Sequence, residues 1–291
     1  MGLTKAVNPK ASIESICKIA SLSRQAYYKH NSKIELDTVN NHKVLSMALS
    51  KRIRNSKLSC KKIYSMIKES LKTENIKLGR DKFINLMGEN GFHVKRKRRN
   101  PNTTKSKHTL PTYTNKLKGI KINRADQVWV SDITFVRTSQ GFMYLSLVTD
   151  LYSRKILGYN LSKSQKTSEV IKALQMSLKN SKRQSETIHH SDRGIQYLCS
   201  EYTKHLKSNN IETSTTKGGS PQENAVAERI NGILKQEYGI SDLRINIPQC
   251  RKLVKEAIEL YNNERPHLSL NMKTPEQYYN EFYCNLNNNI R

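Results

Sequence analysis

Residues 127–136 read QVWVSDITFV, an alternating strand pattern with a single acid, Asp132, at its centre. Residues 142–149, FMYLSLVT, form a second apolar run after the turn at Gln140-Gly141, and residues 155–161 predict a third strand. A charged group inside a strand costs free energy unless it is paired or coordinates a metal. No basic residue beside Asp132 is an obvious partner, so the segment that decides the fold also marks a candidate site.

The segments after these strands change from strand to helix periodicity and back. Apolar side chains recur at helical spacing in residues 167–180, namely Val170, Ile171, Leu174 and Leu178. Residues 187–190 then predict a short strand that ends at Ser191-Asp192. Three strands, a helix and a further strand predict an α/β domain in which helices flank a mixed sheet.

Three acids occupy positions that are unusual for surface carboxylates. Asp132 interrupts a strand, Asp192 follows a strand end, where α/β sheets bind ligands, and Glu228 lies in a helix predicted from about Pro221 to Tyr238. Carboxylates that are brought together repel one another, and a hard divalent cation such as Mg²⁺ removes this conflict. Two such ions, about 4 Å apart, suit an in-line phosphoryl displacement. The acids therefore predict phosphodiester cleavage or transfer.

The composition indicates a soluble protein that binds a polyanion. The 291 residues include 51 basic and 24 acidic side chains, a formal charge of +27, and the mean hydropathy is −0.71. The absence of a long apolar run or an apolar N-terminal segment predicts a cytoplasmic protein with no membrane partner. Five cysteines without a C-x-x-C pair argue against a disulfide framework and against a tetrahedral zinc site. Because no basic amphipathic helix carries Trp and Phe on one face, the expected polyanion is nucleic acid.

The positive charge is concentrated in the first part of the chain. Residues 1–124 hold 29 basic and 7 acidic side chains, whereas residues 125–291 hold 22 and 17. This asymmetry predicts a cationic binding region ahead of a nearly balanced domain. The most basic segment is the run Lys95-Arg96-Lys97-Arg98-Arg99, which opens a Pro-, Thr- and Asn-rich stretch without acids. We interpret residues 95–124 as a linker that tracks DNA, with a solvated tether as the alternative.

Two pairs of helices are predicted ahead of this linker. The first lies within residues 12–30, with a polar break at Ser21-Leu22-Ser23 before a second, short helix. The second combines residues 62–71 with residues 80–89, where Arg80, Lys82 and Asn85 face outward. Such side chains on a helix suit the DNA major groove, although periodicity alone is equally compatible with a plain helix bundle.

The spacing of the acids matches a known signature. Asp132 and Asp192 have 59 residues between them, Asp192 and Glu228 have 35, and Lys235 follows Glu228 by seven, on the same helical face. The surrounding words are Trp129-Val130-Ser131-Asp132-Ile133-Thr134, Asp150-Leu151-Tyr152-Ser153-Arg154 with Gly158, His190-Ser191-Asp192-Arg193-Gly194 with Gln196-Tyr197, Asn224-Ala225 with Glu228, Leu234-Lys235, and Tyr261-Asn262-Asn263 with Arg265-Pro266-His267. Together they resemble the DDE transposases encoded by the second reading frame of bacterial insertion sequences. The likeness covers roughly residues 125–279, and more weakly Ser23-Arg24-Gln25-Ala26-Tyr27-Tyr28, Lys61-Lys62-Ile63-Tyr64 and Gly91-Phe92 in the front half.

The resemblance implies a fold, a reaction and partners. It implies a ribonuclease H-like integrase core in which Asp132, Asp192 and Glu228 hold two Mg²⁺ or Mn²⁺ ions. The enzyme would nick DNA at the ends of the element and transfer the freed 3′-hydroxyl to target DNA, without a covalent enzyme intermediate. Lys235, Arg193 and Asn224 would contact DNA, with a solvated helix lysine as the alternative for Lys235. The helical pattern and the charge run described above add Arg80, Lys82, Asn85 and residues 95–99 as DNA contacts. Expected partners are double-stranded DNA (terminal repeats and target), further copies of the chain, and the first-reading-frame product of the element.

The predicted organisation has four parts: a short helix-turn-helix-like segment (residues 1–36), a second helix-turn-helix-like DNA-binding domain (37–94), the basic linker (95–124) and the catalytic core with C-terminal helices (125–291). The chain departs from the family pattern at Glu223, where an aspartate is usual, and at Ser59, where glycine is common. Three histidines, His189, His190 and His267, are expected to make hydrogen bonds rather than to bind metal. Two other functions stay open: an inactive regulator that binds element ends, and a nuclease that cuts without joining.

Overall fold

The computed structural model describes residues 12–94, 112–217 and 224–288 of the chain. These residues form two compact units. One is built from the described parts of residues 1–51 and 67–93, the other from those of residues 52–66 and 94–291. Each unit is considered by itself. Within the described ranges, no helix is both long enough and apolar enough to cross a membrane.

The first two helices are separated at the polar break that the sequence predicts, but the second helix is much longer than expected. Helix α2 (Ile13–Ile19) is capped by Ser12, whose hydroxyl accepts from the Ser15 amide. Ser21 has a positive φ of 53°, and the Ser23 hydroxyl accepts from the Ala26 amide at the start of helix α3 (Arg24–Arg54). The expectation of a short second helix is wrong, because α3 contains neither Gly nor Pro and runs unbroken for 31 residues, through positions 36 and 37.

The next helix pair matches the periodicity of the sequence. Helix α4 spans Cys60–Thr73 and helix α5 spans Arg80–Glu89, with Gly79 at the N-cap of α5. Phe83 and Met87, one turn apart, are fully buried on α5. The outward position predicted for three polar side chains is confirmed, because Arg80, Lys82 and Asn85 are all exposed.

Among its described residues, the second unit is built on a mixed sheet of five strands in the order β3-β2-β1-β4-β5, which confirms the predicted α/β class. The strands are β1 (Val128–Thr138), β2 (Gly141–Asp150), β3 (Ile156–Ser162), β4 (Thr187–Ser191) and β5 (Ile211–Thr215). The first three form an antiparallel meander, β4 runs parallel to β1, and β5 runs parallel to β4. Strand β1 is therefore central, which explains why its first four residues are all buried instead of alternating.

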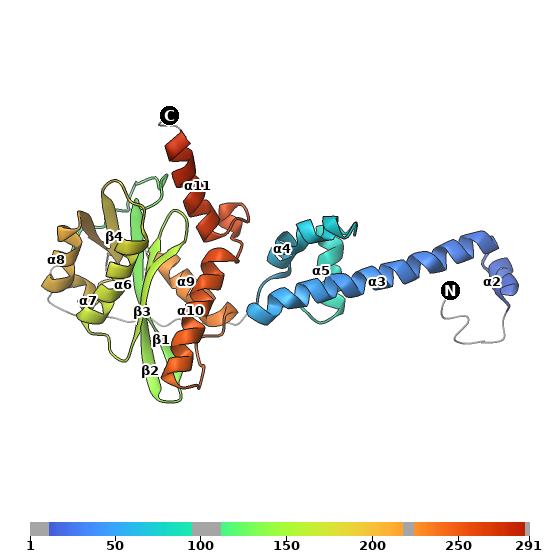
Figure 1. Cartoon of the computed structure of the whole chain (residues 1–291), viewed down its shortest axis with the longest axis horizontal. Coiled ribbons are helices and arrows are strands. Elements are labelled where there is room, and N and C mark those ends of the chain that lie inside the picture. The colour runs from blue at the N-terminus through green and yellow to red at the C-terminus, as the bar shows by residue number, and fades with distance from the viewer. Residues whose placement is uncertain (1–11, 95–111, 218–223, 289–291) are drawn as a thin grey trace. The chain divides into compact units, whose positions relative to one another are not determined.

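Helices cover both faces of this sheet, as Figure 1 shows. Helices α6 (Thr167–Asn180), α7 (Ile195–Leu198) and α8 (Ser200–Ser208) pack on one face with α11 (Pro275–Asn288), around Trp129 and Tyr202. Helices α9 (Ala225–Glu237) and α10 (Ile247–Asn263) pack on the other. Gly158 lets α6 approach β3, because a Cβ at this position would lie 2.1 Å from the Ala173 carbonyl oxygen.

Two buried carboxylates, Asp126 and Asp150, lie together at the end of β2. Asp150 Oδ1 accepts from the Asp126 amide at 2.9 Å, and Asp150 Oδ2 accepts from the amide and the hydroxyl of Ser153. The Asp126 carboxylate in turn accepts from the Trp129 indole and from the hydroxyls of Tyr279 and Tyr283. Burial raises the pKa of Asp150 to about 7, and this effect outweighs the hydrogen bonds that favour the carboxylate.

This raised pKa predicts a pH dependence of folding. Because the pKa of Asp150 is higher in the folded chain than the ordinary value of 3.8, the folded chain keeps a proton that the unfolded chain releases between about pH 4 and pH 7. Stability from this group is therefore lost as the pH rises through that window. Urea unfolding between pH 5 and pH 8 should give a flatter profile for Asp150→Asn than for the wild type. Asp242→Asn, an exposed control, should leave the profile unchanged, and equal slopes for all three proteins would contradict this account.

Candidate active site

Strand pairing brings Asp132 and Asp192 together. Ser131 on β1 is paired with Ser191 on β4, and the strands are parallel. The next residue on each strand is an aspartate, so Asp132 and Asp192 occupy equivalent positions at the point where β4 ends. Asp132 is half-buried and Asp192 is exposed. The candidate site therefore opens toward solvent at the carboxyl end of β4, as expected for ligand binding by an α/β sheet.

Helix α9 adds the third acid. The Asn231 side-chain amide donates to Asp132 Oδ2 at 2.7 Å, which fixes one face of α9 against β1. Glu228 lies three residues before Asn231 and Lys235 four residues after it, so all three share this face of the helix. The predicted start of the helix at Pro221 and the unusual Glu223 lie outside the described residues.

The pKa of Asp132 responds to its burial and to the two other acids. Burial and, to a lesser extent, the nearby Asp192 carboxylate raise the pKa of Asp132 to about 7, with a smaller contribution from Glu228. Hydrogen bonds from Asn231 and from the Ile133 amide oppose the shift. Burial lowers the pKa of Lys235, the basic group on the same helix face, and the Asp132 carboxylate opposes this shift.

The donors fit a hard divalent cation that keeps water ligands. Among the residues with described positions, no three His, Cys, Asp or Glu side chains lie close enough together to hold one ion by themselves. Mg²⁺ is usually held by one or two carboxylates, with water and substrate phosphate completing its shell. Three buried polar atoms around the acids have no hydrogen-bond partner among the described residues: the hydroxyl of Tyr197 and the side-chain oxygens of Asn224 and Asn231. Such atoms are suited to hydrogen bonds with metal-bound water, so the residues present fit a hydrated divalent cation.

Two buried histidines of β4, His189 and His190, make hydrogen bonds close to the acids. His189 Nε2 lies 2.7 Å from the Ser131 hydroxyl and 3.0 Å from the Tyr202 hydroxyl. Burial lowers the pKa of His189 to about 3, so the ring is neutral. His190 Nδ1 lies 2.9 Å from the Ser214 hydroxyl. The expectation that the histidines make hydrogen bonds is confirmed, and His189 secures β1 to β4 next to the acids.

The residues predicted to contact DNA fall in different environments. Lys235 is half-buried, with its ammonium 4.0 Å from the centre of the Phe135 ring. Arg193 donates from Nε to the Thr216 carbonyl, and the buried Asn224 donates its amide to the Ser131 carbonyl. Both side chains thus stabilise the loops around the acids, which sequence reasoning did not predict. Residues 95–99 lie outside the described positions.

A buried ion pair fixes the end of α9. Arg265, only 3% exposed, donates from Nε and Nη2 to the two carboxylate oxygens of Glu237, both at 2.7 Å. His267 Nε2 lies 2.9 Å from Arg265 Nη1, and burial together with Arg265 lowers the pKa of His267 to about 2. The pair was missed by sequence reasoning because Glu237 and Arg265 lie 28 residues apart. Its effect is to hold the helix that carries Glu228.

Removal of this arginine should destabilise the second unit. Arg265→Met leaves the half-buried Glu237 without its bidentate partner and with Lys62 Nζ, 3.4 Å from Oε1, as its remaining cation, which should lower the free energy of unfolding by about 3 kcal/mol. Chemical denaturation followed by circular dichroism measures the change. Arg251→Met on the exposed side of α10 is the matched control, with an expected change below about 0.5 kcal/mol. Similar stability of the two variants would show that the pair does not anchor α9.

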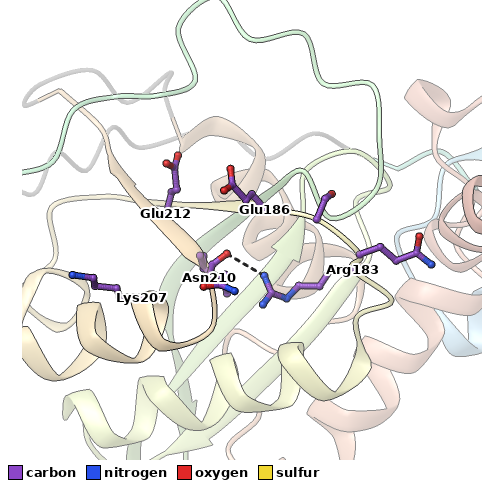
Figure 2. A pocket seen from close by; sticks show the side chains of 8 residues that line it. Arg183, Glu186, Lys207, Asn210 and Glu212 are labelled. Atoms are coloured by element: carbon purple, nitrogen blue, oxygen red, sulfur yellow. Dashed lines mark hydrogen bonds between the residues drawn. The ribbon is translucent and has the colours of Figure 1, made fainter.

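A cavity of about 700 Å³ lies away from Asp132, Asp192 and Glu228. It is bordered by residues 183–186, before β4, and by residues 210–212, at the start of β5, so it lies at the opposite end of these strands from Asp192. Figure 2 shows that the Arg183 guanidinium points to the Asn210 backbone, where it donates to the carbonyl at 3.3 Å, and it also donates to the Asn209 carbonyl. The Arg183 guanidinium therefore makes its hydrogen bonds to the protein backbone, and the cavity is separate from the candidate site.

The sequence of the second unit matches integrase cores. Residues 122–221 and residues 209–275 match two family models, both described as "Integrase core domain". The chain is 31% identical to the transposase for insertion sequence element IS629 of Shigella sonnei, with 78% of this chain and 77% of that protein covered. It is 29% identical to a 31 kDa protein of insertion element IS600 of the same organism, with 92% and 98% covered.

The chain belongs to the insertion-sequence transposases, in agreement with the sequence prediction, and its second unit, the catalytic unit, is an integrase core. Among solved structures, the HTLV-2 integrase catalytic core domain in complex with magnesium matches with a TM-score of 0.44 at 19% identity, covering 54% of this chain and 97% of that chain.

Proposed function

We propose that the chain is a DNA transposase that cuts DNA at the ends of its insertion element and transfers the freed 3′-hydroxyl to target DNA. The observation that supports this most directly is the pairing of Ser131 with Ser191, because it juxtaposes Asp132 and Asp192 beneath the helix that carries Glu228. Three carboxylates at the open end of a parallel strand pair suit metal-assisted phosphodiester chemistry. The membership of the transposase family agrees with this assignment.

Each residue of the site has a distinct task in this proposal. Asp132, Asp192 and Glu228 would hold two Mg²⁺ or Mn²⁺ ions, which when bound supply Lewis-acid activation of the attacking oxygen and stabilisation of the leaving oxygen. Asn231 holds the Asp132 carboxylate in place through its hydrogen bond to Oδ2. Lys235, two turns after Glu228 on the same face, would neutralise a phosphate of the reacting strand.

The chemistry proceeds without a covalent enzyme intermediate in this proposal. The hydroxyl groups near the acids are poor candidates for a nucleophile, because the side chains of Ser153, Ser191 and Tyr197 are all buried. The Ser153 hydroxyl donates to Asp150, and burial raises the pKa of Tyr197 well above its usual range. Water, and then the DNA 3′-hydroxyl, are the remaining attacking groups.

The first part of the chain would supply affinity and position the DNA. Arg80, Lys82 and Asn85 form an exposed polar face on α5 that suits the major groove. The proposed division into residues 1–36, 37–94, 95–124 and 125–291 assigns end recognition to the helical segments and backbone tracking to residues 95–99. The expected partners are terminal repeats, target DNA, further copies of the chain on paired ends, and the first-reading-frame product.

The decisive experiment incubates the full chain with cloned element ends, a target plasmid and Mg²⁺, and scores nicked and joined products separately. Joined products support the transposase. Nicks without joining favour the second candidate, a metal-dependent nuclease. DNA-end binding without any cut strand would assign the chain to the third, a regulator with an inactive core.

A further inference from the structure

Two phenylalanines are exposed on the part of the β1–β2 hairpin that projects beyond the sheet. Strand β4 pairs with β1 only up to Ser131, whereas β1 continues to Thr138, and Figure 1 shows the hairpin reaching past the neighbouring strands. Phe135 and Phe142 are each 54% exposed, and their rings meet edge to face with centroids 5.6 Å apart. The register places both rings on one face of the hairpin, because Phe142 is paired with the residue two positions after Phe135.

A cation is held against this aromatic pair at the border of the acidic site. The Lys235 ammonium lies 4.0 Å from the centre of the Phe135 ring. Lys235 is one turn beyond Asn231, the residue that binds Asp132. Phe135 follows Asp132 by three residues, which is about 10 Å along an extended strand at roughly 3.3 Å per residue. The aromatic pair and the ammonium therefore lie within one or a few nucleotides of the proposed cleavage point.

The size of the patch discriminates between a nucleobase and a protein partner. A phenylalanine buries about 150–250 Å² when it is fully covered, so two half-exposed rings offer roughly 200 Å². A stable protein interface needs about 800 Å² from each partner, which is several times more. An unpaired base matches the smaller area, because every base has a flat face that stacks on an aromatic ring. A neighbouring ammonium supplies the matching charge for its phosphate.

We propose that Phe135 and Phe142 form a stacking platform for an unpaired base of the DNA end, with Lys235 bound to the adjoining phosphate. This inference rests on the proposed function, since it describes how the same site holds its DNA. Separation of base pairs beside the cleavage point costs free energy, and stacking on the platform offsets part of that cost. The platform thereby gives the reacting strand access to the acids.

The test compares two element-end duplexes, one fully paired and one with three unpaired bases beside the cleavage point, bound to the full chain without metal. We expect the wild type to prefer the unpaired end by roughly tenfold or more, because stacking on a protein aromatic ring strengthens binding of each free base. Phe135→Ala and Phe142→Ala should reduce this preference below about twofold while binding of the paired duplex is unchanged. Phe142→Tyr keeps a ring and should keep the preference. Leu268→Ala, at an exposed apolar residue outside the hairpin, is the matched control.

A fluorescent base provides a second readout. 2-Aminopurine at the unpaired position should be quenched by the wild type and remain bright with Phe142→Ala. Unaltered preference and quenching in both alanine variants would overturn the platform. A change of oligomeric state in the same variants without DNA, measured by light scattering, would also overturn it and would assign the rings to a contact between copies of the chain.

The two proposals fail in distinguishable ways. If the wild type cuts and joins DNA with Mg²⁺ while the alanine variants keep their preference for unpaired ends, the platform is wrong and the transposase assignment stands. If the preference depends on the rings but no strand is cut, the platform stands and the catalytic assignment is wrong.

Discussion

Asp192→Asn should abolish Mg²⁺-dependent strand cleavage and joining, with a loss of at least about 1000-fold, equivalent to about 4 kcal/mol of transition-state stabilisation. The substitution removes a negative charge from the exposed acid that follows β4 and keeps the size of the side chain. Asp192 Oδ1 accepts from the Gly194 amide at 3.0 Å, a bond that the asparagine carbonyl can also make. The fold should therefore persist while metal binding is lost. Cleavage and joining are measured on labelled element ends.

The control for this variant separates charge loss from a local effect at the site. Glu201→Gln removes an exposed acid on α8 and should leave cleavage unchanged. DNA affinity of Asp192→Asn should stay within about twofold of the wild type, because Asp192 is not itself one of the proposed phosphate contacts. Undiminished cleavage by Asp192→Asn would refute the assignment of the acids as metal ligands.

Replacement of the five basic residues 95–99 by glutamine should weaken DNA binding about 100-fold or more at moderate salt. Each phosphate contact contributes about 0.9 to the slope of log affinity against log salt, so the slope should fall by about four to five. The reason is that the positive charge is concentrated in residues 1–124, with 29 basic and 7 acidic side chains, and this run is its densest part. Fluorescence anisotropy at several salt concentrations measures both quantities.

A matched variant tests whether position or only total charge matters. It replaces five exposed lysines of the catalytic unit by glutamine: Lys179, Lys204, Lys207, Lys252 and Lys255. Both variants lose five positive charges, yet only the loss of residues 95–99 should change the salt slope strongly. Equal slopes in the two variants would contradict the proposed division between a binding region and a catalytic core.

Local patterns predicted most of the sheet and two of its covering helices. The strands expected at residues 127–136, 142–149 and 155–161 correspond to β1, β2 and β3, and the expected helix at 167–180 is α6. The fifth strand, β5, was not predicted, because Ile211–Thr215 is short and mostly polar. It becomes a strand through parallel pairing with β4, a contact that propensity does not encode.

The candidate site, like the fold, was predicted from the sequence only in part. The sequence by itself determined that Asp132 lies in a strand and needs a partner, and that Glu228 and Lys235 share a helix face, because both statements depend on periods of two and 3.6 residues. The family resemblance implied that Asp132 and Asp192 act together. Only the tertiary structure decided the strand register that places them side by side, the hydrogen bond from Asn231 to Asp132, and the ion pair of Arg265 at the end of α9. These contacts join residues that are 28 to 99 positions apart in the sequence. They form because strand register and helix packing are set by the burial of apolar side chains throughout the unit, and local sequence spacing determines only part of that burial.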